Sequence, residues 1–411
     1  MDIRYCRFCN ASLRDIFIDL GASPLANSYL SQAQLEQMEP FYPLRAYVCN
    51  RCFLVQLDEF ESPDHIFSRY AYFSSYSDIW LQHARMYTDM IVGRFELDNQ
   101  SQVIEIASND GYLLQYFMAR DIHVLGIEPA VNVANIAIEK GIPTLTEFFG
   151  EKLARRLVSE GRQANLVVGN NVLAHVPQLN DFVRGLKILL KPFGLITLEF
   201  PHLLRLMAEN QFDTIYHEHL SYFSFITIEQ IFAAHGLMLF DVEELPTHGG
   251  SLRVYACHAE DRSKDVGSRV VNLKAREKAA GFTCLDTYIS YAEQVKETKR
   301  KILAFLIEAK REGKSIVGYG APAKGNTLLN YCGVRSDFID YTVDRSPHKQ
   351  GLFLPGTHIP IYHPDKIKET KPDYVLILPW NLRDEIIAQM GNIREWGGQF
   401  IVPIPEMKVI A

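Results

Sequence analysis

The sequence predicts an α/β protein in which a small cysteine-rich module precedes two doubly wound units. Two Cys-x-x-Cys pairs fall within the first 52 residues. Strand and helix patterns then alternate, and the alternation restarts after a charged helical stretch. Such alternation is typical of parallel sheets with helices on both faces. We therefore expect three domains, at 1–75, 76–259 and 260–411.

Composition narrows the class of protein. The chain has 411 residues, of which 47% are hydrophobic and 22% charged, as in soluble globular enzymes. A net charge of −7 argues against a nucleic-acid-binding protein, which would carry a basic face. No apolar run approaches the roughly 20 residues that span a bilayer, and the start lacks the apolar stretch of a signal peptide. We expect a cytoplasmic protein without nucleic-acid or membrane partners. Nothing in the sequence indicates an obligate interface, so a monomer is possible and the oligomeric state is left open.

Four of the seven cysteines form the two pairs, Cys6 with Cys9 and Cys49 with Cys52. Four thiolates can hold a tetrahedral zinc ion, and the alternative is four reduced core cysteines. The paired spacing favours zinc. Because all four positions are taken by protein sulfurs, the ion would be structural, and it would stabilise a module whose own core is marginal.

The middle and C-terminal elements follow in order from the pattern of apolar residues. A helix is expected from Trp80 onward. The alternating elements after it are strands and helices at 103–110, 111–121, 123–129, 131–141, 165–176 (a strand and turn), 182–194 and 195–201, then two antiparallel strands over 240–258. A long amphipathic helix over 260–311 joins the domains. A strand at 314–320, a glycine turn and helix at 320–333, and strands at 338–347 and 373–380 complete a second doubly wound unit.

Polar residues at the strand ends of the middle unit predict a nucleoside ligand. Glu105 starts a strand-to-helix turn that holds one glycine, and Glu128 ends the next strand. The match to the three-glycine dinucleotide fingerprint is poor. An acid that can accept from ribose hydroxyls, with no phosphate seat, suits the cationic S-adenosylmethionine. The expected cofactor-binding residues are Glu105, Ser108, Asn109, Gly111, Glu128, Pro129, Phe149, Asn170 and Asn171. A core position is the alternative for Phe149.

A second glycine turn, over 318–330, begins the C-terminal unit. It is not a P-loop, because its lysine precedes the last glycine. Glycines, a lysine and a helix N-terminus can still seat an anion. A bound nucleotide diphosphate is one interpretation, and an empty Rossmann-like scaffold is the other. The candidate residues here are Lys324, Asn326, Asp344, Trp380 and Asn381.

Residues 216–219 place Tyr, His, Glu and His side by side. On a strand the two histidines would face the same way, but no third metal ligand stands nearby. Each histidine alone could be structural. Four polar groups in a row, followed by Tyr222 and Phe223, favour a catalytic cleft in which a glutamate tunes an imidazole for general-base chemistry.

Taken together, these stretches resemble the nucleotide-sugar 3-C-methyltransferases that make branched deoxysugars. The resemblance rests on the cysteine pairs, on EIASNDGYLL, NNVLAHV, YHEHLSYFS, THGGSLRV and GYGAPAKGNTLLN, and spans nearly the whole chain. It implies a zinc-binding domain, a class I methyltransferase domain binding S-adenosylmethionine and a Rossmann-like C-terminal domain. It also implies a TDP-linked 4-keto-deoxysugar substrate that is methylated at C3.

The resemblance also implies roles for individual residues. His219 would be the base, with Tyr216 and Glu218 beside it, and His175 would line the same site. A tyrosine after the zinc module would join them, and both Tyr70 and Tyr72 qualify. His219 would remove the C3 proton, and the tyrosine and histidine groups would hydrogen-bond the enolate.

Three other functions are compatible with parts of the sequence. A sugar O- or N-methyltransferase needs no ketone. A zinc-ribbon adaptor with vestigial Rossmann units would need a basic surface, against which the net charge argues. A nicotinamide-dependent sugar oxidoreductase lacks its triple-glycine turn.

Overall fold

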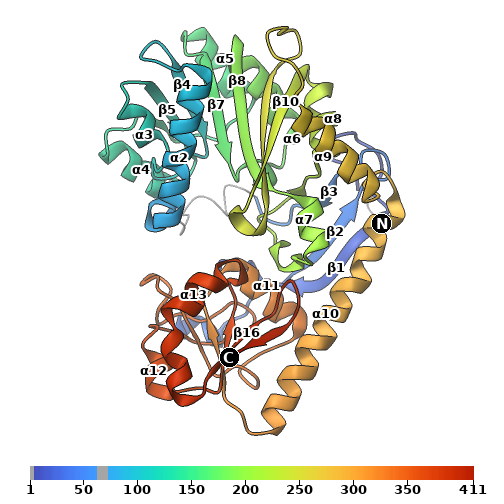
Figure 1. Cartoon of the computed structure of the whole chain (residues 1–411), viewed down its shortest axis with the longest axis vertical. Helices are drawn as coiled ribbons and strands as arrows, with labels where there is room; N and C mark the ends of the chain where they lie inside the picture. The colour runs from blue at the N-terminus through green and yellow to red at the C-terminus, as the bar shows by residue number, and fades with distance from the viewer. Residues whose placement is uncertain (1–3, 63–72) are drawn as a thin grey trace.

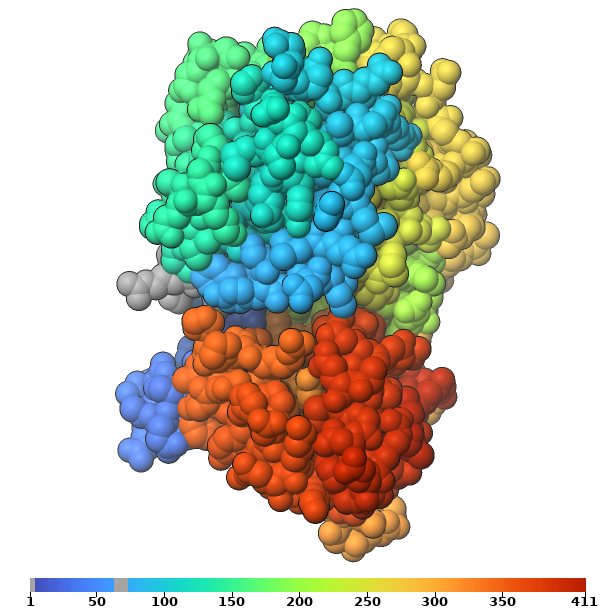
Figure 2. Space-filling model, turned by 60° about the vertical axis from the view of Figure 1, so that its left-hand side comes forward, coloured from blue at the N-terminus to red at the C-terminus, as the bar shows by residue number. Residues whose placement is uncertain are grey.

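The computed structural model describes residues 4–62 and 73–411, and these residues form three β-sheets (Figure 1). The first sheet belongs mostly to the cysteine-rich module, the second to the middle unit and the third to the C-terminal unit. In Figure 1 the middle unit lies above the C-terminal unit, and the N-terminal strands lie beside the junction between them. Figure 2 shows the two larger units as separate bodies that meet along a narrow band. Among the described residues, no helix combines the length and apolar content needed to cross a bilayer.

The N-terminal sheet has four antiparallel strands in the order β1, β2, β3, β9. Their bounds are β1 Asp15–Ser23, β2 Tyr42–Val48, β3 Val55–Leu57 and β9 Ser221–Tyr222. The last strand comes from the middle of the sequence, where Tyr222 pairs with Val55. Because β9 directly follows residues 216–219, the N-terminal module holds one end of that polar stretch.

The middle sheet has seven strands in the order β10-β11-β8-β7-β4-β5-β6. Strands β4 to β8 are parallel, and β11 is antiparallel to both β8 and β10, which confirms the predicted antiparallel finish. The strand bounds are β4 Gln102–Ile106, β5 His123–Ile127, β6 Thr144–Leu145, β7 Ala164–Asn170, β8 Leu190–Pro201, β10 Leu237–Leu245 and β11 Ser251–His258. The helices are α2 Asp78–Phe95, α3 Leu114–Met118, α4 Val131–Glu139, α5 Glu151–Ser159, α6 Leu179–Leu189, α7 Leu203–Ala208 and α8 Phe225–Ala234.

Two predicted boundaries differ from the structure. The helix expected to run to residue 194 ends at Leu189, and β8 begins at Leu190 opposite Ala164. Pro192 explains the early end, because proline inside a helix removes a backbone donor and clashes with the preceding turn. The helix expected over 111–121 is the short α3, since the residues before it form a turn.

The single long helix expected over 260–311 is instead two helices, α9 Ser268–Ala279 and α10 Leu285–Arg311, separated by a turn at Gly281, whose φ is 85°. The long α10 runs along one side of the molecule (Figure 1). It packs on the N-terminal sheet, where Tyr291 stacks on Phe17 with ring centroids 5.0 Å apart. Apolar residues of α10, the N-terminal sheet and the C-terminal unit therefore share one core.

The C-terminal sheet has six strands in the order β14-β13-β12-β15-β16-β17, of which only β17 is antiparallel to its neighbour. The strand bounds are β12 Ile316–Tyr319, β13 Thr342–Val343, β14 Ile361–Tyr362, β15 Tyr374–Ile377, β16 Gln399–Val402 and β17 Lys408–Ile410. The helices are α11 Ala323–Cys332, α12 Lys366–Thr370 and α13 Arg383–Gln389. The predicted second doubly wound unit is thus confirmed.

Candidate active site

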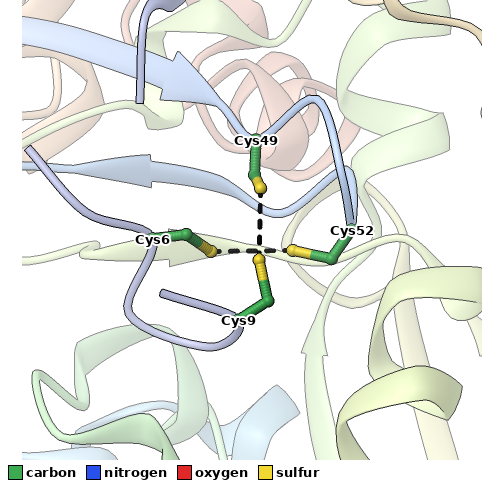
Figure 3. Close-up of side chains that lie close together, drawn as sticks. All are labelled: Cys6, Cys9, Cys49 and Cys52. Atoms are coloured by element: carbon green, nitrogen blue, oxygen red, sulfur yellow. Dashed lines mark hydrogen bonds between the residues drawn. The ribbon is translucent and has the colours of Figure 1, made fainter. Parts of the chain in front are cut away.

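Four cysteine sulfurs converge in the N-terminal module (Figure 3). Their Sγ atoms lie within 4.8 Å of one another, with 3.6 Å between Cys6 and Cys52 and 3.4 Å between Cys9 and Cys49. Sulfurs about 2.3 Å from a central zinc in a tetrahedron would be about 3.8 Å apart, so the cluster fits that ion. The four ligands complete its coordination, and the site is structural.

Three residues of the loop after β4 have left-handed backbone. Ala107, Asn109 and Gly111 have φ angles of 58°, 50° and 77°, in the region that glycine adopts most readily. Only one of the three is glycine, which is why the sequence showed a poor fingerprint. A Cβ on Gly111 would lie 2.3 Å from Cδ1 of Ile142, so the space beside this glycine is filled by the protein.

Two buried carboxylates flank this loop. Glu128 accepts hydrogen bonds from the backbone N–H groups of Asn109 at 3.0 Å and Ala130 at 2.9 Å. Burial raises the pKa of Glu128 and raises that of Glu105 well above its usual range, although the Tyr112 hydroxyl opposes the shift at Glu105. No described group makes a hydrogen bond of normal geometry to either Glu105 oxygen. A cationic ligand without phosphate, such as S-adenosylmethionine, fits this pair of acids.

The other residues expected around the cofactor are distributed unevenly. Ser108 is buried in the same loop, and Pro129 follows Glu128. Asn170 ends β7 and donates to the Tyr112 hydroxyl at 3.1 Å. The ring of Phe149 instead packs edge-on against Phe182 of α6, with centroids 5.3 Å apart. Phe149 is half-buried against that core cluster, and its contact with the cofactor stays a prediction.

His219 is held as a neutral imidazole in a defined tautomer. Its Nδ1 lies 2.9 Å from the carbonyl oxygen of Thr214, which can only accept, so Nδ1 carries the proton. Its Nε2 accepts from the Tyr216 hydroxyl at 2.9 Å. Burial, then the positions of His175, His248 and Lys324, lower the pKa of His219 well below its usual range. The half-buried ring therefore presents an unprotonated nitrogen at neutral pH.

His175 lies beside this base. The two imidazole rings are 4.9 Å apart between centroids and meet edge to face. Nδ1 of His175 donates to the carbonyl oxygen of Glu218 at 2.7 Å, and burial lowers the pKa of His175 to about 4. Two neutral histidines from η3 Leu173–His175 and the 216–219 stretch therefore line one space.

The carboxylate of Glu218 faces the N-terminal module. Asn27, in the loop after β1, donates its amide to Oε1 of Glu218 at 2.6 Å. Burial raises the pKa of Glu218 to about 7, and the Asn27 hydrogen bond opposes that shift. The sequence offered no signal for Asn27, because its partner is 191 residues away.

The remaining members of the polar stretch separate. His217 turns to the N-terminal module, where Nε2 donates to the Pro43 carbonyl oxygen at 3.3 Å. Tyr222 stays near His219, with ring centroids 6.2 Å apart, and burial raises the pKa of its hydroxyl well above the usual range. A small cavity lies between His219 and Tyr222 and is bounded also by Ala174 and Thr214.

The C-terminal unit brings Lys324 and its polar and aromatic neighbours to the junction with the middle unit. Nζ of Lys324 donates to Oδ1 of Asn381 at 2.8 Å and lies 4.6 Å from the Trp380 ring centroid. The Trp380 indole donates to Oδ2 of Asp213 at 2.7 Å, in η4 Phe212–Thr214. Burial raises the pKa of Asp213 to about 7, against the opposing charge of Lys324. Sequence reasoning missed Asp213, which had no motif to mark it.

Asn326 and Asp344 lie on the other side of the glycine turn. The Asn326 amide donates to the carbonyl oxygen of Ala26 at 2.6 Å. Oδ2 of Asp344 accepts from the backbone N–H of Ala321 at 2.8 Å, and Lys349 lies 3.7 Å from the same carboxylate. A side chain of the protein thus already engages the turn's backbone. Tyr70 and Tyr72 lie outside the described residues.

Comparison with known proteins covers the whole chain. Family models match residues 6–67, described as "Putative zinc binding domain", residues 81–242, described as a methyltransferase domain, and residues 246–405, described as a C-methyltransferase C-terminal domain. The chain is 36% identical over 406 residues to the C-methyltransferase NovU of Streptomyces niveus, covering 99% of this chain and 96% of that protein.

Solved structures match less than half of the chain. Magnesium protoporphyrin IX methyltransferase (ChlM) from Synechocystis with bound SAM shows a TM-score of 0.34 and 16% identity, covering 44% of this chain and 82% of that one. The PH0226 protein from Pyrococcus horikoshii shows a TM-score of 0.37 and 14% sequence identity, covering 48% of this chain and 99% of that one.

Proposed function

Because the chain belongs to the family of S-adenosylmethionine-dependent C-methyltransferases with an N-terminal zinc-binding domain, we propose that it methylates C3 of a TDP-linked 4-keto-deoxysugar through an enolate. Carbon is not nucleophilic until a proton leaves. A carbon next to a ketone loses a proton far more readily than any other carbon of a sugar. The acceptor must therefore bring a carbonyl group, and the protein must bring a base.

The observation that carries this proposal is the tautomer of His219. Its Nε2 is unprotonated, and the Tyr216 hydroxyl marks the direction in which a proton can be received. We assign His219 as the base that removes the C3 proton. Thr214 holds the ring through Nδ1, so the imidazolium formed keeps that hydrogen bond.

The positive charge and the hydrogen-bond donors near His219 would stabilise an enolate. Lys324 is close enough to lower the pKa of His219, and the same charge would stabilise a negative oxygen at C4. Tyr216, once displaced from Nε2, can donate to that oxygen or to a neighbouring hydroxyl. His175 has a fixed ring that presents Nε2 in the same space.

The Glu218 carboxylate is suited to accept a hydrogen bond from a sugar hydroxyl. This carboxylate is oriented by Asn27, and with a pKa of about 7 it is a hydrogen-bond acceptor on the alkaline side of neutrality. Of the two interpretations of the C-terminal glycine turn, we propose that the TDP group lies beside it. Tyr222, Lys324, Asn326, Asp344, Trp380 and Asn381 remain the candidates for substrate contacts.

The donor side uses the loop after β4. S-adenosylmethionine, when bound, supplies a methyl group on a positively charged sulfur. Glu128 is the candidate acceptor for ribose hydroxyls, and a positively charged ligand would favour the carboxylate form of the buried Glu105. Holding donor and acceptor in line accounts for much of the acceleration expected of such an enzyme.

The test is product analysis combined with isotope exchange. A panel of TDP-linked 4-keto-deoxysugars is incubated with enzyme and donor, and products are examined by mass spectrometry and NMR. We expect one methyl group on C3. In deuterium oxide with S-adenosylhomocysteine in place of the donor, the C3 hydrogen should exchange with solvent. Methylation of a hydroxyl or amine without C3 exchange would replace this proposal with the O- or N-methyltransferase alternative.

A further inference from the structure

The turn between β10 and β11 has a run of three residues with left-handed backbone. His248, Gly249 and Gly250 have φ angles of 54°, 92° and 121°. Glycine adopts these angles without strain, but histidine does so rarely. An unfavourable backbone angle at a residue near a reaction site often accompanies a function of its side chain. The Thr-His-Gly-Gly stretch is part of the family resemblance, but the resemblance implies no role for it.

A hydrogen bond holds this turn on one side, and close packing confines it on the other. Oγ1 of Thr247 donates to Oε1 of Glu199 at 2.7 Å, and Oε2 of Glu199 accepts from His83 and Arg253, both at 2.9 Å. On the opposite side, a Cβ on Gly249 would lie 2.7 Å from Cη2 of Trp380. The turn therefore fits between the middle sheet and the C-terminal unit, and His248 has little freedom to move.

The side chain of His248 meets another residue with left-handed backbone. Asn171, directly after β7, has φ 55°, and its Nδ2 lies 3.2 Å from Nε2 of His248. An amide nitrogen can only donate, so Nε2 of His248 accepts and its proton is on Nδ1. The Trp80 ring meets His248 edge to face at 5.2 Å. Burial lowers the pKa of His248 to about 4, so the ring is neutral at pH 7.

The other end of the same amide is available for a ligand. Oδ1 of Asn171 is buried and has no hydrogen-bond partner among the described residues. Asn171 directly follows β7, the strand next to β4, whose loop is the proposed donor site, and it lies four residues before His175. A group bound between the donor loop and the His175–His219 pair would therefore pass Asn171.

We propose that His248 is a positioning residue for methyl transfer, which accepts from Nδ2 of Asn171 and so directs Oδ1 toward the positively charged sulfonium end of the methyl donor. A carbonyl oxygen there favours the cationic donor, whose methyl hydrogens are weak donors. Without the imidazole acceptor the amide could rotate and present N–H groups to a cation. This inference rests on the proposed donor site in the loop after β4, and it uses the sugar exchange reaction as one readout.

The experiment compares ligands that differ in charge at the sulfur position. His248→Leu removes the acceptor, and His248→Gln restores one. Binding of S-adenosylmethionine, of sinefungin (an amine replaces the sulfonium) and of S-adenosylhomocysteine is measured by calorimetry. We expect the leucine variant to bind the two cationic ligands about 10- to 100-fold more weakly while S-adenosylhomocysteine changes by less than about threefold, and the glutamine variant to recover part of the loss. An equal loss for all three ligands would overturn the proposal.

A double-mutant cycle tests whether His248 acts through Asn171. The Asn171→Ala/His248→Leu variant should discriminate between the ligands no worse than Asn171→Ala alone. Additive losses would mean that His248 acts by another route. In His248→Leu, methyl transfer should fall by a larger factor than C3 exchange with bound S-adenosylhomocysteine, and an equal loss of both would count against a role at the sulfonium. Absence of exchange in the wild-type enzyme would instead count against the proposed sugar chemistry, leaving the binding result to stand alone.

Discussion

The Tyr216 hydroxyl donates to Nε2 of His219 at 2.9 Å, and the opposite nitrogen of the same ring donates to a backbone carbonyl. The imidazole is therefore neutral, oriented and paired with a donor that a substrate can displace. This pairing is the basis of the proposed proton abstraction.

Replacing His219 by asparagine should abolish most of the chemistry without preventing binding. We expect methyl transfer to fall by roughly 10²–10⁴-fold, because a general base contributes about that factor. Initial rates give the loss, and calorimetry checks that donor and sugar nucleotide still bind. Tyr216→Phe keeps the ring beside His219 and should cost less than the asparagine variant. Near-normal turnover of His219→Asn would assign the base to another residue.

The Asn27–Glu218 pair should set the pH dependence of the reaction. The folded protein raises the pKa of Glu218 to about 7, so the carboxylate forms as pH rises through that value. If the carboxylate holds a sugar hydroxyl, kcat/KM should rise through the same range. Asn27→Leu removes a hydrogen bond that favours the charged form, so the pKa rises further and the rising limb moves to higher pH.

The control for that shift is the exposed neighbour Ser28, whose replacement by alanine leaves the pair intact. A pH–rate profile for Asn27→Leu that overlays the wild-type and Ser28→Ala profiles would remove Glu218 from the titrating step.

Loss of zinc should affect the active site as well as the N-terminal module. Metal analysis should find about one zinc ion per chain. Cys49→Ser should lower the zinc content and the melting temperature, because the zinc ion joins two segments that are far apart in the sequence. Methyl transfer should fall too, since β9 pairs with β3 just after His219. The exposed Cys284→Ser is the matched control. Full activity in a zinc-free Cys49→Ser protein would contradict this coupling.

Asp213 should make the protein less stable as pH rises from about 4 to 7. Its folded pKa, about 7, lies above the ordinary value of 3.8, so the folded state binds a proton that the unfolded state has lost over that interval. The difference corresponds to at most about 4 kcal/mol. Asp213→Asn should flatten that part of the curve of unfolding free energy against pH. Exposed Asp337→Asn should leave the curve unchanged, and an equal slope in both variants would exclude Asp213 as its source.

The sequence by itself determined the zinc ligands, the order of the elements and the stretch that holds His219. These depend on short-range signals, namely paired cysteines, the alternation of strand and helix patterns, and polar residues at strand ends. The same signals misplaced the end of α6 only because Pro192 sits within an otherwise helical pattern.

Tertiary structure alone decided which polar residues meet. Asn27 reaches Glu218 across 191 residues, and Trp380 reaches Asp213 across 167. Asn171 and His248 meet only because two turns with left-handed backbone lie at one edge of the sheet. Ala107 and Asn109 likewise have left-handed backbone, which the sequence alone does not predict at these positions. Such features depend on the packing of three sheets against each other, and local propensity carries no information about that packing.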